Sequence, residues 1–127
     1  MRTPKLIKLA AALGIALLAA CDGDGGTGIC PAEVVPALRV TVVDDETGAD
    51  LSLTARGWWI HEEYADDLIG SVTGGPLHAF GPPGRYAVIV EHEGYQSWGR
   101  DNIRVTAGAC GPRTLDITAR LEPSPLD

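Results

Sequence analysis

Five consecutive residues in the middle of the chain begin like the zinc-binding motif of a metalloprotease. His61, Glu62, Glu63, Tyr64 and Ala65 follow one another. The motif requires a second histidine four residues after the first, because two imidazoles one helical turn apart hold the metal. Ala65 stands at that position. One of the two imidazole ligands is therefore missing, and we expect no zinc site in this segment.

The rest of the chain offers no better set of catalytic residues. His78 and His92 are isolated along the sequence, and there is no Gly-x-Ser-x-Gly nucleophile motif. A catalytic site needs a nucleophile, a base and a group that orients the base. The sequence supplies no such set, so we expect a protein that is not an enzyme and that has no metal or cofactor.

The segment around His61 is instead rich in aromatic and acidic residues. They are Trp58, Trp59, Glu62, Glu63, Tyr64, Asp66 and Asp67. Aromatic rings stack on sugars and cations, and carboxylates bind calcium or accept hydrogen bonds, so one hypothesis is a carbohydrate- or calcium-binding module. We favour another interpretation, because consecutive strand residues face opposite ways. One tryptophan would then fill the core, its neighbour would be half exposed, and the acids would form a solvated loop.

Length and charge limit the other functions. The 127 residues suffice for one domain, and three of the 10 basic residues, Arg2, Lys5 and Lys8, lie in the first eight positions. From Cys21 onward seven arginines stand against all 17 acids, which gives a net charge of −10. Phosphate backbones and anionic headgroups repel such a chain, so we expect no nucleic-acid partner and no electrostatic membrane docking.

The first 20 residues have the layout of a secretory signal. The three basic residues precede an uncharged apolar run, Leu9–Ala20, which is too short to span a bilayer. Leu18, Ala19, Ala20 and Cys21 then resemble, position by position, the lipobox of bacterial lipoproteins. The resemblance implies cleavage before Cys21 and attachment of diacylglycerol and a fatty acyl group such as palmitate to that residue. It places the protein in the bacterial cell envelope, on its periplasmic or surface face, with the membrane as a partner.

Residues 21–29 are rich in glycine and predict a flexible linker between the lipid and a domain over residues 30–122. With Cys21 lipidated, the remaining cysteines are Cys30 and Cys110. In an oxidising compartment these two should form a disulfide. In the chain-entropy model, closing the long loop between Cys30 and Cys110 contributes ~4 kcal/mol to the stability of the folded domain.

The domain shows the two-residue periodicity of β-strands. Alternating patterns predict strands at Leu38–Val43, Leu51–Arg56, Arg85–His92, Asn102–Thr106 and Thr114–Leu121, and weaker signals suggest short strands at Leu68–Val72 and Leu77–Phe80. Leu51–Arg56 could continue through Trp58 and Ile60. Six or seven such strands predict an all-β fold, an antiparallel two-sheet sandwich, followed by a tail at residues 123–127.

The order of short motifs in this domain resembles the carboxypeptidase regulatory-like family. The motifs are Val40-x-Val42-x-Asp44-x-x-Thr47-Gly48, Pro83-Gly84-x-Tyr86-x-Val88-x-Val90, Gly94-Tyr95, Ile103-x-Val105 and Cys110. The resemblance implies a prealbumin-like sandwich of about seven strands. Physically, Asp44 and Thr47 suit a tight turn that Gly48 completes with a positive φ angle. The Tyr95 hydroxyl is expected to bond a loop carbonyl.

These observations predict a lipid-anchored envelope protein whose sandwich is a non-catalytic interaction or structural module. Its expected partners are the membrane, through Cys21, and another envelope protein or a glycan. The alternative is the carbohydrate- or calcium-binding module described above.

Overall fold

The computed structural model describes Cys30 and residues 33–125, which form strands, turns and loops without a helix. The strands are β1 (Leu38–Asp44), β2 (Arg56–His61), β3 (Tyr64–Asp67), β4 (Leu77–Ala79), β5 (Gly84–Glu91), β6 (Trp98–Val105), β7 (Ala107–Gly108), β8 (Gly111–Pro112) and β9 (Leu115–Leu121). No helix in this part of the chain is long and apolar enough to cross a membrane. The predicted signal, Cys21 and the linker lie outside the described residues.

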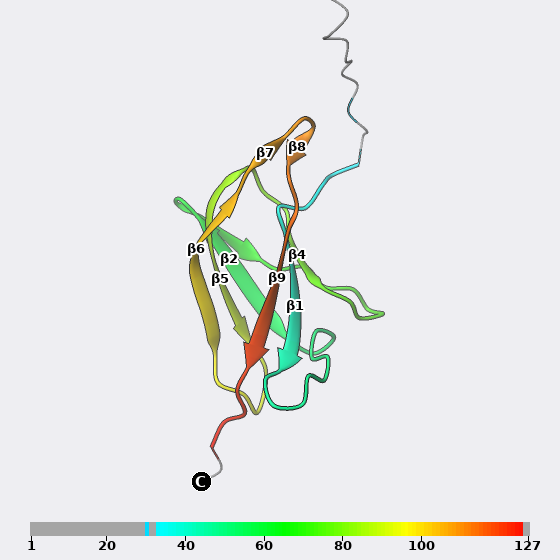
Figure 1. The fold of residues 1–127 in the computed structure, drawn as a ribbon, viewed down its shortest axis with the longest axis vertical. Coiled ribbons are helices and arrows are strands. Elements are labelled where there is room, and N and C mark those ends of the chain that lie inside the picture. The colour runs from blue at the N-terminus through cyan, green and yellow to red at the C-terminus, as the bar shows by residue number, and fades with distance from the viewer. Residues whose placement is uncertain (1–29, 31–32, 126–127) are drawn as a thin grey trace, which may run out of the picture. The chain divides into compact units, whose positions relative to one another are not determined.

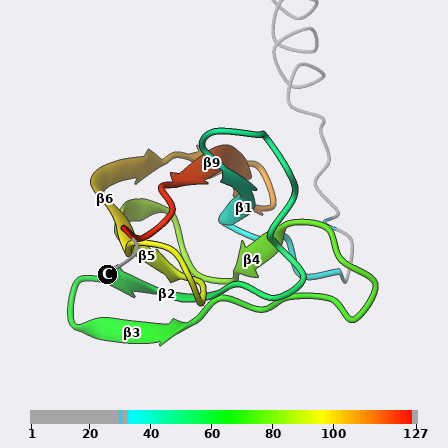
Figure 2. The ribbon, with the colours of Figure 1, turned by 90° about the horizontal axis from the view of Figure 1, so that it is seen from below.

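The strands form two main sheets within one compact unit (Figures 1 and 2). One sheet has the order β4-β1-β9, the other has the order β3-β2-β5-β6, and β7 and β8 form a separate small hairpin. Seen along the strands, the two sheets lie as layers that enclose an interior (Figure 2). The expected all-β fold is therefore confirmed.

The core forms where the inward-facing positions of the two sheets meet. Tyr86, Val88 and Val90 of β5 are almost completely buried, as the alternation of that strand predicts. The other sheet contributes mainly aliphatic side chains. The buried hydrophobic residues of both sheets are Ala37, Leu38, Val40, Val42, Trp59, Leu68, Leu77, Ala79, Tyr86, Val88, Val90, Ile103, Val105, Ile117, Ala119 and Leu121.

One prediction about strand direction is wrong. β1 and β9 pair in parallel, from Leu38 opposite Leu115 to Asp44 opposite Leu121, so the sandwich is not wholly antiparallel. β6 runs toward the end of the sandwich at which β1 begins, and only the short β7–β8 hairpin separates it from β9. β9 therefore starts beside the start of β1 and runs in the same direction.

A second correction concerns the segment Leu51–Arg56, whose first five residues form a turn instead of a strand. The Ser52 hydroxyl accepts a hydrogen bond of 3.0 Å from the Val42 amide. The Ser52 amide donates to the Asp50 carboxylate at 2.8 Å. These side-chain bonds take the place of a strand ladder, and the strand begins only at Arg56.

The weaker strand signals had mixed outcomes. β4 confirms the signal at residues 77–80. In the segment 68–72, Ile69 forms only an isolated bridge to His78. The strand β3 was not predicted, because all four of its residues are exposed and its pattern shows no apolar face.

The predicted disulfide is confirmed: Cys30 and Cys110 are bonded to each other. Cys110 lies in the turn between β7 and β8. The bond closes a loop that contains most of the sandwich strands, so it restricts the unfolded chain strongly.

At the opposite end of the sandwich, the turn after β1 is organised by Asp44, which is only 7% exposed. Its carboxylate accepts hydrogen bonds from the amides of Glu46 and Thr47, at 2.7 and 2.9 Å. Gly48 has a φ of 77°, as predicted. The Tyr95 hydroxyl donates to the same carboxylate at 2.6 Å, so the expectation of a carbonyl acceptor was wrong. The bond from Tyr95, followed by those from the backbone, lowers the pKa of Asp44.

This network predicts a specific sensitivity to acid. A carboxylate with a lowered folded-state pKa stabilises the fold above its ordinary pKa of 3.8, and the stabilisation is lost as the pH falls through the folded-state pKa. Tyr95→Phe removes the largest cause of the lowered value. We expect this variant to be less stable than the wild type at pH 7 and to lose less stability between pH 7 and pH 2, measured by urea unfolding.

Tyr64→Phe is the matched control, because Tyr64 is 71% exposed. Asp50 and Asp116 also have lowered pKa values, so the wild type and both variants keep some acid sensitivity. An unchanged pH dependence in Tyr95→Phe would show that the hydroxyl does not set the pKa of Asp44.

Candidate functional site

A pocket of about 400 Å³ opens between β2, β3 and the loop that joins β4 to β5. We call it the β2–β3 pocket. It is lined by Trp59, His61, Glu62, Tyr64, Ala65, Asp66, Phe80, Gly81 and Pro82. The lining combines aromatic rings with two carboxylates.

The β2–β3 hairpin positions six of these nine lining residues. His61 pairs with Tyr64, and Trp59 pairs with Asp66, across the two antiparallel strands. Directly opposite residues place their side chains on one face of a sheet. Glu62 completes the tight turn between the strands with a φ of 55°. The hairpin therefore presents aromatic and acidic side chains together on the pocket side.

Three packed aromatic rings form the wall behind the pocket. The Tyr86 ring lies 5.4 Å from the Trp59 ring and 4.9 Å from the His61 ring, measured between centroids. The Tyr86 hydroxyl donates to the Pro82 carbonyl at 2.6 Å, and burial raises the pKa of Tyr86. His61 is only 7% exposed, and its Nδ1 donates to the Arg85 carbonyl at 3.1 Å. Hydrogen bonds and ring contacts thus hold both polar aromatic side chains in place.

Four of the seven residues that the sequence suggested for ligand binding meet in this pocket. They are Trp59, Glu62, Tyr64 and Asp66. Trp58, Glu63 and Asp67 are not part of its lining. Trp59 is 6% exposed and belongs to the core, whereas Trp58 is half-buried and pairs with Asp67. The alternation of the two tryptophans is confirmed.

Sequence reasoning missed the other side of the pocket. Phe80, Gly81 and Pro82 come from the β4–β5 loop, and Phe80 is 38% exposed. In the sequence this loop shows a strand end followed by a proline turn, and neither signal indicates a binding surface. Only the folding of β4 into the opposite sheet brings the loop beside β3.

This arrangement suits a ligand with both an apolar face and hydroxyl groups. Tyr64 and Phe80 offer exposed rings, and the carboxylates of Glu62 and Asp66 can accept hydrogen bonds. In the described part of the chain, no three side chains of histidine, cysteine, aspartate or glutamate are grouped so that they could hold a metal ion. The three histidines contact separate rings: His61 contacts Tyr86, His78 contacts Phe80, and His92 contacts Tyr95.

A more polar hollow of about 490 Å³ lies at the other end of β5. In it the Nδ1 of His92 donates to the Glu93 carbonyl at 2.8 Å, which leaves Nε2 to accept from the Thr54 hydroxyl at 2.6 Å. The pair links the turn before β2 to the end of β5. We therefore assign it a structural role.

Comparison with known proteins adds no assignment. No protein-family model matches the chain, and no curated protein matches its sequence.

The close approach of Gly84 to His61 gives a test of the pocket wall. A Cβ at Gly84 would collide with the His61 ring, and Gly84 has a φ of 145°. We expect Gly84→Ala to displace the ring from Tyr86 and to cost about 1–3 kcal/mol for overpacking, in addition to backbone strain of about 1–3 kcal/mol. Urea unfolding and the NMR shifts of the His61 ring would measure both effects.

Gly94→Ala separates the two contributions. Gly94 also has a positive φ, of 86°, but no heavy atom lies within 4 Å of an added Cβ. This variant should show the cost of a positive φ without a steric collision. Equal losses of stability in the two variants would mean that the contact with His61 does not constrain the pocket wall.

Proposed function

We propose that this protein is a lipid-anchored component of the bacterial cell envelope and that its sandwich is a non-catalytic interaction or structural module. The observation that carries the proposal is the order of the N-terminal sequence. A basic segment, a short apolar run and Leu18-Ala19-Ala20-Cys21 follow one another without interruption. The Cys30–Cys110 disulfide supports export, because such bonds persist mainly in oxidising compartments.

The proposal also covers the type of sandwich. We infer a prealbumin-like sandwich of the carboxypeptidase regulatory-like type. Support comes from the places that the shared motif residues occupy. Asp44 and Gly48 form the turn after β1, Tyr86 and Val88 lie in the core, and Tyr95 reaches back to Asp44. Each of these residues stabilises the scaffold. This agrees with a non-catalytic interaction or structural module.

The anchor can be tested by substitution at the lipidation site. Cys21→Ala should abolish incorporation of labelled palmitate and prevent maturation at residue 21. The reason is that the cysteine sulfur carries the diacylglycerol and acylation follows on the new amino terminus. The measurements are fatty-acid labelling and the mass of the purified protein.

Cys110→Ala is the matched control, because it removes a cysteine that has a different proposed role. This variant should remain labelled and membrane-bound while it loses the disulfide, which typically contributes about 2–4 kcal/mol. Labelling that persists in Cys21→Ala would refute the anchor.

A second candidate function, carbohydrate binding, is favoured by the composition of the β2–β3 pocket. Tyr64 is 71% exposed and Phe80 is 38% exposed, so two rings are free to stack on a sugar. Glu62 and Asp66 line the same pocket and can accept hydrogen bonds from sugar hydroxyls. A glycan of the cell envelope is the partner that this chemistry would recognise.

Titration calorimetry with soluble cell-wall glycan fragments tests the second function. We expect Tyr64→Ala to weaken binding about tenfold, because loss of an aromatic platform removes 1 kcal/mol or somewhat more of contact energy. Trp58→Phe should bind like the wild type, since Trp58 does not line the pocket. Absence of heat at millimolar glycan, or equal losses in the two variants, would exclude the pocket as the glycan site.

A further inference from the structure

Two arginines lie directly opposite each other on neighbouring strands. Arg85 near the start of β5 pairs with Arg104 near the end of β6. The next pair along the ladder, Tyr86 and Ile103, points into the core, so the two arginines share the outer face of the sheet. Both are exposed. Like charges in this position are destabilising.

The surrounding structure does not neutralise this pair. Among the described residues, arginine forms ion pairs only between Arg39 and Asp116 and between Arg56 and Glu91. Glu62 and Asp101 line a hollow on the other side of Arg85, but neither forms an ion pair with it. In the part of the chain that the structure describes, these two adjacent arginines thus have no carboxylate partner.

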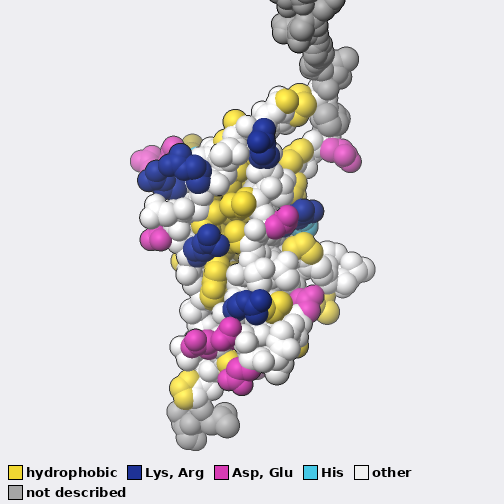
Figure 3. All heavy atoms as spheres, viewed as in Figure 1, with side chains coloured by type: hydrophobic (Ala, Val, Ile, Leu, Met, Phe, Trp, Pro, Cys, Tyr) yellow, Lys and Arg dark blue, Asp and Glu magenta, His cyan; other side chains and the backbone are white. Residues whose placement is uncertain are grey.

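A hollow of about 500 Å³ adjoins the pair. Its lining consists of Gly84, Arg85, Arg104, Val105, Thr106 and Ala107, and it contains no acidic residue. Figure 3 shows basic side chains gathered over the region where β5 begins and β6 ends. Two guanidinium groups and the Thr106 hydroxyl provide several hydrogen-bond donors beside one another. This is the chemistry that recognises a phosphate group, because each guanidinium can bond two of its oxygens.

We propose that Arg85 and Arg104 form a binding site for a phosphate group. The bound anion would replace the repulsion between the arginines by two attractive contacts. The site is local, so it is compatible with the acidic character of the whole chain, which disfavours long-range attraction to anionic surfaces.

The phosphate can come from a soluble phosphate compound or from a lipid headgroup. The arginine pair lies at the same end of the sandwich as the β7–β8 turn, which Cys110 joins to Cys30. Cys30 is nine residues after Cys21 in the sequence, a span of about 30 Å when fully extended. With the proposed anchor at Cys21, a segment of this length keeps Cys30 within about 30 Å of the lipid headgroups.

Arginine modification on the wild-type chain tests the site. The full chain, purified in a neutral detergent, is treated with phenylglyoxal at constant ionic strength, with and without inorganic phosphate, and the modified arginines are identified by mass spectrometry. With phosphate at about ten times its Kd, modification of Arg85 and Arg104 should slow roughly tenfold. Arg120 is the internal control, because it is exposed and forms no ion pair within the described residues. Equal slowing at Arg120, or no slowing at the pair, would overturn the proposal.

Vesicles distinguish the two sources. Protection in phosphatidylglycerol vesicles but not in phosphatidylcholine vesicles would identify the lipid headgroup as the ligand. Protection by free phosphate in phosphatidylcholine vesicles, without added protection from phosphatidylglycerol, would identify a soluble compound. The detergent experiment contains no bilayer, so it can succeed or fail independently of the anchor at Cys21.

Substitutions separate binding from a structural role. Arg85→Gln and Arg104→Gln should each weaken phosphate binding about tenfold, the effect of losing one charge-assisted contact. Neither should lower the urea midpoint, because each removes a repulsion. Arg120→Gln should leave the affinity for phosphate unchanged. Unchanged affinity in both variants of the pair would refute the site.

Discussion

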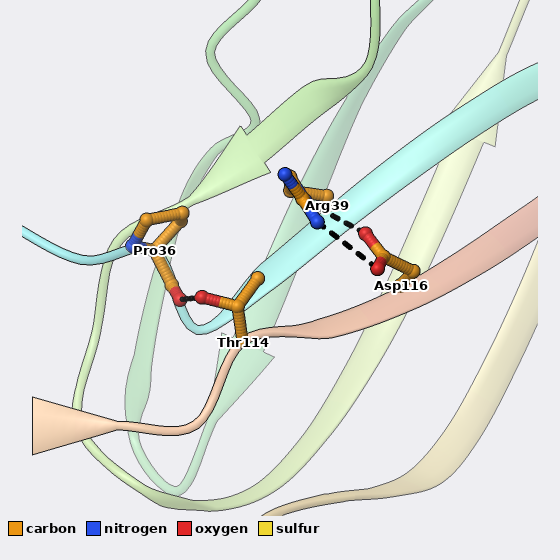
Figure 4. Close-up of polar contacts among 4 residues, drawn as sticks. All are labelled: Pro36, Arg39, Thr114 and Asp116. Carbon is orange, nitrogen blue, oxygen red and sulfur yellow. Dashed lines mark hydrogen bonds and ion pairs between the residues drawn. The ribbon is translucent and has the colours of Figure 1, made fainter. Parts of the chain in front are cut away.

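The parallel pairing of β1 with β9 is the constraint on which the rest of the sandwich depends. It joins segments from the two ends of the domain over seven registered residue pairs, from Leu38–Leu115 to Asp44–Leu121. Side chains secure its beginning: the Thr114 hydroxyl donates to the Pro36 carbonyl at 2.6 Å, and Arg39 forms hydrogen bonds of 2.7 and 3.1 Å with Asp116 (Figure 4). The surface ion pair alone contributes little. Its value is to reinforce a register that the buried faces of both strands already require.

Sequence periodicity predicted the strands that bury one face. β1, β5 and β9 were found within one or two residues, because their apolar positions alternate clearly. The pattern could not give their partners, since a strand with one buried face looks the same in parallel and antiparallel pairs. The pattern also failed where side chains, in place of a neighbouring strand, form hydrogen bonds with backbone amides. Leu51 and Leu53 alternate with polar residues like one buried face of a strand, but Leu53 is 61% exposed and Ser52 is buried, where its hydroxyl bonds the Val42 amide.

The candidate pocket was predictable only in part, for a different reason. The aromatic and acidic segment indicated one wall, because Trp59, Glu62, Tyr64 and Asp66 are close in sequence. The facing wall, at Phe80, depends on a contact between segments that belong to different sheets. The position of His61 depends on a tertiary feature as well, since only a glycine at position 84 leaves room for its ring. Local sequence patterns carry no information about close contacts between segments that are far apart in the sequence.

The topology explains why the candidate features gather at one end of the sandwich. β1, β5 and β9 begin there, and β2, β4 and β6 end there, as their pairings require. The same end therefore receives the β2–β3 turn, the β4–β5 loop, the arginine pair and the disulfide-bonded β7–β8 turn. At the opposite end, beside the polar hollow at the end of β5, Asp44 forms hydrogen bonds with Tyr95 and the turn backbone. The residues proposed to bind ligands thus lie at one end, whereas the polar groups of the Asp44 network have partners within the fold.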